Sequence, residues 1–275
     1  MPGYSETLVR KQDYDRYIAA LFAPEPVRPD LFALYAFNYE VAKTAETVRN
    51  PVAGQIRLQW WRERVEEIYA GKPARTGIVT ALANAVARHG LDRPLFDDLI
   101  DARECDLDPA PFADLPRLEA YADTTSGNLM RLAARVLGAG ETLDENAREA
   151  GIAYAITGML RALPFHAARG HIAQPADEMA RAGVAPDQIL RGRMSPNIAP
   201  LIARMSDIAR AHYQRVMRLE RRYLPAILPA ALVPAFIRVL NRPDFDLFRD
   251  STEMPGYRRQ WIMLRAVIEG RFPTR

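Results

Sequence analysis

The stretch YAFNYEVAKTAE, residues 35–46, poses the question on which the fold and function of this chain depend. Its apolar residues recur at helical spacing, so the stretch predicts the middle of a buried helix. Residues three or four apart share one face of a helix, which is how a helix presents paired carboxylates to a metal ion. Here those positions hold Ala42 and Glu46, with Lys43 beside them. The stretch is therefore either a metal site that has lost its acids or a helix that never carried one.

The same helical spacing continues along almost the whole chain, and alternating strand-like runs are missing. A chain of 275 residues with 49% hydrophobic residues can bury a sizeable core. No internal repeat and no long linker interrupts the pattern. The sequence predicts a single all-α domain over residues 1–275, a bundle of about ten helices.

Composition excludes several classes of protein. The net charge of +3 is spread along the chain without basic blocks interleaved with aromatics, so we expect no nucleic-acid partner. The single cysteine, Cys105, excludes an internal disulfide, fits a reducing compartment and is interpreted as an inert thiol. Neither a secretory leader nor a run of about 18 apolar residues is visible, which predicts a cytoplasmic protein, peripheral to a membrane at most.

Residues that start and stop helices predict individual limits. A helix over residues 5–22, capped by Ser5, ends at the prolines of APEPVRPD. Asp30 is expected to cap a second helix that runs to about Val48. A third helix, residues 54–71, is expected to turn one stripe inward: Ile56, Trp60, Val65 and Ile68 or Tyr69.

Glycines mark a second feature of the core. Ser126 and Gly127 lie centrally in a helical segment and predict a kink or a close approach of another backbone. The segment 144–163 is so apolar, with small residues at helical spacing such as Gly151, that it is expected to be buried on most sides.

Five segments, in order along the chain, resemble the squalene and phytoene synthases, a family of prenyl transferases. The resemblance extends from about Tyr14 to Phe248 and implies an isoprenoid-synthase-type bundle around a central cavity. The segments are LFALYAF (31–37), RLQWWRERVEEIYAG (57–71), LIDARECDLD (99–108), YADTTSGNLMRLAARVLG (121–138) and GIAYAITGMLRALPFHAARGHIAQP (151–175).

The chemistry of that family sets what the first motif should contain. Ionising an allylic diphosphate needs Mg²⁺ to neutralise the leaving pyrophosphate, and carboxylates of two facing helices hold these ions. The first family motif reads roughly Tyr-Ala-Phe-Cys-Arg-x-x-Asp-Asp-x-x-Asp. Aligned on YAF at 35–37, the positions that follow are Asn38, Tyr39, Ala42, Lys43 and Glu46. One carboxylate remains where the family has three.

The second family motif, Gln-x-x-Asn-x-x-Arg-Asp-x-x-x-Asp, keeps no carboxylate here. Its positions are Ala155, Gly158, Arg161, Ala162 and His166. Pro164 also predicts that the helix ends or kinks at this point. The resemblance therefore implies no metal site and no cofactor, with Mg²⁺ required only if the chain is a divergent transferase.

The replacements permit two interpretations. They could converge as a metal-free anion-binding cluster made of Lys43, Arg161, His166 and Arg169. Alternatively, and in our preferred interpretation, Lys43 and Arg161 pair with Glu46 across the former cavity. His166 and His171 lack a third ligand nearby, which supports a transition-metal site only weakly.

The segments RALPFHAARGHIAQP (161–175) and RPDFDLF (242–248) resemble one branch of the family, that of a mitochondrial complex I assembly factor and its bacterial relatives. This resemblance implies a non-catalytic role in building respiratory complex I, with a complex I subunit or assembly protein as partner and an isoprenoid or other apolar ligand in the cavity. The alternative is a divergent prenyl transferase acting on farnesyl or geranylgeranyl diphosphate.

The C-terminal segment YRRQWIMLRAVIEGRF (257–272) raises a third possibility. An apolar stripe of Tyr257, Trp261, Leu264 and Ile268 runs beside Arg258, Arg259, Arg265 and Arg271. Such a helix could lie on a membrane surface, peripheral at the inner membrane. We prefer the alternative of a helix packed on the bundle with its arginines outward.

Overall fold

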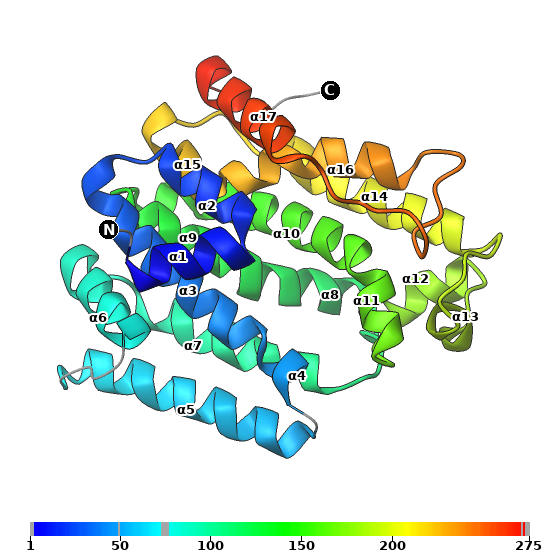
Figure 1. Ribbon diagram of the computed structural model, residues 1–275, viewed down its shortest axis with the longest axis horizontal. Helices are drawn as coiled ribbons and strands as arrows, with labels where there is room; N and C mark the ends of the chain where they lie inside the picture. Colours follow the sequence, from blue (N-terminus) through cyan, green and yellow to red (C-terminus); the bar gives the residue numbers. More distant parts are fainter. Residues whose placement is uncertain (1–2, 49, 73–76, 271, 273–275) are drawn as a thin grey trace.

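The computed structural model describes residues 3–48, 50–72, 77–270 and 272, and in these residues the fold is all-α, as predicted (Figure 1). Several helices are short, and 3₁₀ turns and one π-helical turn connect some of them. The helices are α1 (Tyr4–Gln12), α2 (Tyr14–Leu21), α3 (Arg28–Ala42), α4 (Thr44–Thr47), α5 (Pro51–Tyr69), α6 (Gly77–His89), α7 (Arg93–Ala102), α8 (Leu115–Ala122), α9 (Asn128–Val136), α10 (Asp144–Arg161), α11 (Leu163–Ala168), α12 (Ala176–Arg181), α13 (Pro186–Leu190), α14 (Ile198–Arg215), α15 (Leu224–Ile227), α16 (Val233–Leu240) and α17 (Gly256–Glu269).

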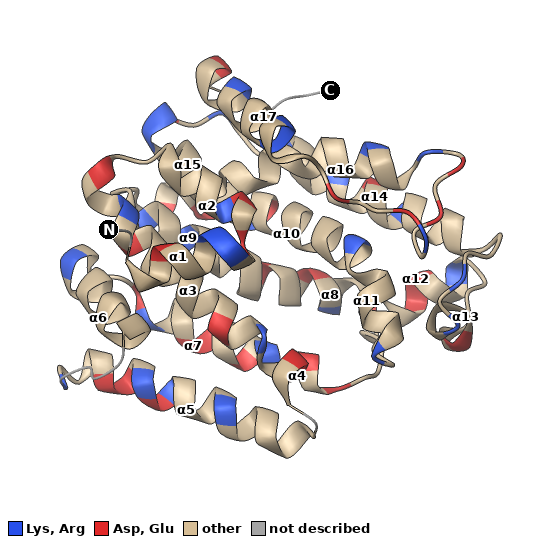
Figure 2. Ribbon diagram, in the orientation of Figure 1, with Lys and Arg blue, Asp and Glu red and all other residues tan. Residues whose placement is uncertain are grey.

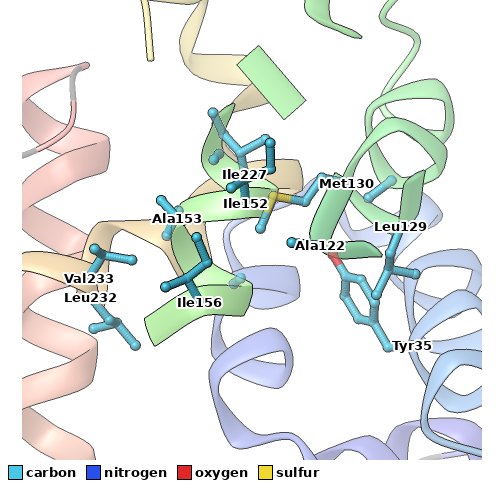
Figure 3. Packing of buried hydrophobic residues seen from close by; sticks show 14 of the residues in the cluster. Tyr35, Ala122, Leu129, Met130, Ile152, Ala153, Ile156, Ile227, Leu232 and Val233 are labelled. Carbon is cyan, nitrogen blue, oxygen red and sulfur yellow. The ribbon is translucent and has the colours of Figure 1, made fainter. Parts of the chain in front are cut away.

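Helix α10 runs through the middle of the bundle. It packs against α14 and α16 on one side and α9 on the other, while α3 packs against α1, α6 and α9 (Figure 1). Figure 3 shows Ile152, Ala153 and Ile156 of α10 between Val233 and Met130, which belong to elements on opposite sides. The prediction that this apolar helix is buried on most sides is confirmed, and most of the buried hydrophobic residues form one contiguous cluster.

The predicted close approach of two backbones lies between the α8–α9 connection and α10. Asp123–Gly127 forms a single π-helical turn there, which is the predicted irregularity. A Cβ atom built on Gly151 would stand 2.5 Å from the Cα atom of Gly127. Glycine at position 151 therefore allows the backbone of α10 to contact the backbone of the π-helical turn.

The single predicted helix over residues 5–22 is wrong. It is divided into α1 and α2 at Asp13, whose side chain accepts a hydrogen bond from the backbone N–H of Arg16 (3.2 Å). An aspartate that caps a new helix at its N-terminus competes with continuation of the old one, which explains the break. Ser5 lies inside α1 and does not cap it.

The predicted limits of the second helix also need correction. Helix α3 begins at Arg28, and the buried Asp30 accepts a hydrogen bond from Arg88 Nη1 (2.7 Å) while contacting His89 Nε2 (2.8 Å). The Asp30 carboxylate, which was expected to cap the helix, therefore binds two side chains of α6 instead. At its other end α3 stops at Ala42 and does not reach Val48, since a turn at Lys43 precedes the short α4.

The stripe predicted to face inward on α5 is partly wrong. Val65 is buried, but the exposed fractions of Ile56 and Trp60 are 66% and 38%. The helix instead buries Leu58, Trp61 and Val65, which share one face. With two adjacent tryptophans, the sequence fits either face. In the structure α5 packs against α7 and η2 (Arg103–Leu107), and the ring of Trp61 meets Phe37 of α3 edge to face, with centroids 5.3 Å apart.

One segment, Arg221–Leu240, is long and apolar enough to cross a membrane. However, 78% of its most apolar window is buried inside the fold. It is divided among short helices that include α15 and α16, and it packs as part of the core.

Candidate functional site

The chain segments that carry the two motifs end at the same pocket, which has a volume of about 390 Å³. Its apolar side comes from the turn after α3 and from the end of α10, and its polar side from η2 and α11. The residues that matter for the argument below are Ala42, Glu46, Arg103, Asp106, Tyr121, Met159, Phe165, His166, Arg169 and His171.

Pro164 lies at the break between the two helices that end at the pocket. Helix α10 stops at Arg161, Ala162 lies at the junction, and α11 begins with Pro164 in its first turn. The prediction that the helix ends or kinks here is therefore confirmed. The break directs the short α11, with His166 and the following Arg169, to the pocket.

Two histidines form one wall of the pocket. The rings of His166 and His171 meet edge to face with centroids 5.4 Å apart. His166 Nδ1 is buried without a hydrogen-bond partner in the described structure. Burial, and secondly the proximity of His171, lower the pKa of His166 to about 4. His166 is therefore neutral near pH 7 and contributes no positive charge to an anion site.

A polar network that the sequence interpretation missed lines part of the pocket. Arg103 Nη1 lies 3.1 Å from Asp106 Oδ2 and donates to the hydroxyl of Tyr121 (2.7 Å), which in turn donates to Asp106 (2.6 Å). Burial raises the pKa of Tyr121 well above its ordinary value. The segment LIDARECDLD supported the family resemblance, but nothing in its spacing marked Arg103 and Asp106 as neighbours of the motif helices.

Arg169 is the predicted cation that does reach the pocket. Its guanidinium stacks on the ring of Phe165 (4.2 Å), and Nη1 donates to the backbone carbonyl of Glu46 (3.4 Å). Glu46 itself is exposed at the pocket rim. These contacts join the last position of the first motif to the segment that follows the second motif.

Lys43 and Arg161 do not join this cluster. Lys43 pairs with Glu40 and lies over the ring of Tyr39 (4.7 Å). Arg161 stacks on Phe236 (3.7 Å) and approaches Glu253 (3.5 Å). The expectation that Lys43 and Arg161 pair with Glu46 is therefore wrong, because each has a closer carboxylate outside the pocket.

The other motif positions lie outside the pocket. Asn38 is buried in α3, and Ala155 packs against the core from α10. A Cβ atom on Gly158 would meet nothing within 4 Å. Of all the motif positions predicted from the sequence, the pocket is lined by Ala42, Glu46 and His166.

A second charged network lies between the other faces of α10 and α2. Asp15 Oδ1 lies 2.9 Å from Arg259 Nη1, and Tyr154 of α10 donates to Asp15 Oδ2 (3.2 Å). Arg16, one residue on, lies over the ring of Tyr154 (5.2 Å) and is paired with Asp13. Burial raises the pKa of Asp15 despite the opposing effect of Arg259.

The residues at the pocket do not fit a magnesium–diphosphate site. Such a site needs several carboxylate oxygens that face one another with free lone pairs. Asp106 is engaged by Arg103 and Tyr121, and the nearest other carboxylate in the pocket is the rim residue Glu46. In the part of the chain that the structure describes, no three His, Cys, Asp or Glu side chains are grouped so that they could hold a metal ion.

Fold and site together define an all-α protein of isoprenoid-synthase type. A dehydrosqualene synthase solved in complex with ligand superposes with a TM-score of 0.84 at 18% identity, over 97% of this chain and 94% of that chain. The squalene synthase HpnC from Alicyclobacillus acidocaldarius gives a TM-score of 0.69 at 19% identity, over 97% and 92%. These similarities establish the fold.

The squalene/phytoene synthase family profile matches residues 9–261, and the chain belongs to this family. The complex I assembly factor 6 of Homo sapiens is 31% identical over 255 residues, 91% of this chain and 77% of that protein. The 15-cis-phytoene synthase of Synechococcus elongatus is 25% identical over 277 residues, 92% of this chain and 89% of the synthase. The resemblance found in the sequence is thus confirmed, and the relatives include both an assembly factor and a synthase.

Proposed function

We propose that this protein acts in the assembly of respiratory complex I and does not catalyse prenyl transfer. The observation that carries the proposal is the pair of emptied motif positions at one pocket. Ala42 stands at the end of α3, and His166 in α11 is neutral. The relatives support the same direction, since the assembly factors of several animals are 30% or 31% identical to this chain and the cyanobacterial phytoene synthase 25%.

Electrostatics supports the absence of diphosphate chemistry. Glu40, a second carboxylate within the first-motif stretch but not at a metal-binding position of the motif, is held by Lys43 and by Arg57 Nη2 (2.9 Å). Recruiting Glu40 to a metal would leave two cations without their partner, at a cost that grows as the group is buried. A pyrophosphate leaving group would therefore find no preorganised counter-charge of the kind that metal-dependent ionisation needs.

The pocket remains suited to a ligand. Alanine, methionine and phenylalanine side chains line one side. The charged lining residues are two arginines and two carboxylates: Arg103 is paired with Asp106, whereas Arg169 donates to the backbone carbonyl of Glu46, whose side chain lies at the rim. Because these charges balance and His166 is neutral, we propose that the pocket takes a neutral, largely apolar molecule such as an isoprenoid alcohol or quinone.

The alternative is a divergent prenyl transferase acting on farnesyl or geranylgeranyl diphosphate. It is favoured by the phytoene synthase among the relatives and by Arg169, whose guanidinium faces the pocket. This alternative needs Mg²⁺ or an arginine cluster in its place. Of the four side chains predicted to form such a cluster, however, Lys43 and Arg161 are paired elsewhere.

Deletion of the gene in the native host separates the two functions. The assembly function predicts less mature complex I on native gels and lower NADH-linked respiration, with unchanged carotenoid and hopanoid levels, and full recovery on complementation. The opposite pattern would overturn it. Purified protein should release no pyrophosphate from farnesyl or geranylgeranyl diphosphate with Mg²⁺ above the level of a heat-denatured control, whereas prenyl products above that level would establish the transferase.

A further inference from the structure

Helix α17 packs on the bundle through the face opposite to its apolar stripe. Its buried residues are Arg259, Met263 and Ala266. The predicted stripe of apolar residues points to solvent, and the exposed fractions are 76% for Tyr257, 65% for Trp261, 38% for Leu264 and 59% for Ile268. The sequence interpretation in which the arginines point outward is wrong for Arg259, and Arg271 lies outside the described residues.

Arg259 explains why the helix takes this orientation. Its guanidinium is 2.9 Å from Asp15 and is also paired with Glu253, while Nε donates to the carbonyl of Met254 (2.9 Å). These partners fix the rotation of α17 about its axis. Rotating the apolar stripe inward would strand two carboxylates and expose Met263, so the orientation is specified by the side chains.

The exposed stripe has the chemistry of a membrane interface. Tyrosine and tryptophan are the residues that favour the boundary between headgroups and acyl chains, and leucine and isoleucine extend the same face for three turns. Arg258 and Arg265, seven residues apart, flank one side of the stripe. Both are exposed, and Glu269 is the one acidic residue of the helix.

Positive charge extends beyond the helix itself. Arg221, in the loop before α15, donates to the carbonyl of Ile268 (2.7 Å), so this loop lies beside the C-terminal end of α17 (Figure 2). Arg218 and Arg222 are exposed in the same loop, and the single acid there, Glu220, is paired with Arg222 (2.9 Å). The stripe and the loop together present apolar side chains beside an excess of arginine, which complements an anionic lipid surface.

The chain beyond the helix leaves the stripe open as far as the structure describes it. After the left-handed Gly270, the ring of Phe272 stacks on Tyr213 of α14, with centroids 5.6 Å apart. Phe272 is buried, so the chain turns toward the bundle immediately after α17 and not along its outer face. In Figure 1, α17 lies at the edge of the molecule.

We infer that the outer face of α17, defined by Tyr257, Trp261, Leu264 and Ile268 with Arg258 and Arg265, docks the folded protein onto an anionic lipid bilayer. The helix lies parallel to the surface with its apolar stripe at the acyl boundary and its arginines among the headgroup phosphates. This inference is independent of complex I assembly, since it concerns where the protein is held and not what it acts on.

Vesicle flotation of the full chain tests the inference. Binding to vesicles that mix phosphatidylcholine with phosphatidylglycerol should exceed binding to phosphatidylcholine alone and weaken as salt rises. The double variant Trp261→Asp/Leu264→Asp should lower binding about tenfold or more, because it places two charges at the acyl boundary. The matched control Ile56→Asp, at an equally exposed apolar residue of α5, should bind as the wild type does.

Fluorescence gives a readout that misfolding would not imitate. Brominated lipids should quench the wild-type tryptophan emission, and Trp261→Phe should abolish most of this quenching while retaining flotation, since Trp60 and Trp61 lie on α5. Unchanged circular dichroism of each variant keeps the comparison valid. The inference would be overturned if the wild type did not float with the vesicles, or if Trp261→Asp/Leu264→Asp floated equally well. It would also be overturned if the wild type bound no lipid but self-associated, and the double variant did not, because the face would then be a protein interface.

Discussion

Gly151 of α10 lies directly against Gly127 of the π-helical turn before α9, and the space between them cannot hold a methyl group. A Cβ atom at position 151 would stand 2.5 Å from both the Cα and the backbone nitrogen of Gly127. Because the obstructing atoms belong to a backbone, no side chain can move aside. We therefore expect Gly151→Ala to lower the free energy of unfolding by about 1–3 kcal/mol, the usual cost of overpacking.

Gly158, two turns further along α10, is the matched control. A Cβ there would meet nothing within 4 Å, and the residue has ordinary helical geometry. Gly158→Ala should raise the free energy of unfolding by about 0.5–1 kcal/mol, because alanine has less freedom to lose in the unfolded chain. Urea titrations of both variants measure the difference, and equal effects of the two substitutions would contradict the close approach.

The buried ion pair of Asp15 and Arg259 gives a second prediction. Arg259→Ala removes the cation that pairs with Asp15, a carboxylate whose exposed fraction is 5%. The substitution therefore removes the ion pair that joins α17 to α2. Breaking a buried pair on one side typically costs about 3–5 kcal/mol, because the remaining charge is left without compensation. The neighbouring exposed Arg258→Ala should change stability by less than about 0.5 kcal/mol. Thermal unfolding of the two variants measures both effects, and similar melting temperatures would contradict a structural role for Arg259.

Much of the fold follows from sequence periodicity, and the failures have a common physical origin. The all-α class, the burial of α10, the break at Pro164 and the contact at Gly127 each depend on local chemistry that a sequence displays. The break at Asp13 was missed, and the cap at Asp30 was wrong, because a carboxylate can serve either as a cap or as a tertiary partner. The positions of Arg88 and His89, far along the chain, decide between these roles for Asp30.

The site was less predictable than the fold. The motif positions located the two helices, but a formal charge in the sequence does not tell where that charge is neutralised. Lys43, in the turn after α3, is paired with Glu40 of that helix, and burial makes His166 neutral. Arg103 and Asp106, which complete the pocket, come from a segment far from both motifs in the chain. Their proximity depends on the packing of α7 and η2 against α5, which sequence spacing cannot give.

The lowered pKa of His166 predicts a particular dependence of stability on pH. In the unfolded chain a histidine binds its proton below about pH 6.5, whereas in the folded protein this occurs only near pH 4. The contribution of His166 is therefore complete above pH 6.5 and is lost as the pH falls toward 4. For this partly exposed residue the loss between pH 7.5 and pH 5 should be on the order of 1–2 kcal/mol.

Comparison with His166→Gln isolates that contribution from the titration of acidic residues. Glutamine keeps hydrogen-bonding groups at the position but does not titrate. The free energy of unfolding of His166→Gln should fall less between pH 7.5 and pH 5 than that of the wild type, by the same 1–2 kcal/mol. Urea titrations at the two pH values provide the measurement, and parallel losses in both proteins would show that the imidazole protonates freely in the folded state.

The charge balance of the pocket predicts its ligand preference. With Arg103 occupied by Asp106, and Glu46 beside Arg169, the pocket offers a diphosphate little net positive charge, and the neutral His166 adds none. Farnesol or geranylgeraniol should therefore bind at least as tightly as the corresponding diphosphates, and Mg²⁺ should not improve the binding of either. Isothermal titration calorimetry with both pairs of ligands, with and without Mg²⁺, measures this directly.

Met159→Asp, which puts a charge on the apolar wall, should weaken binding of the alcohols by about tenfold or more, since a charge would be desolvated without a partner. Arg169→Ala should change it little. A diphosphate that binds more tightly than its alcohol only when Mg²⁺ is present would instead show that metal-dependent recognition persists in this pocket.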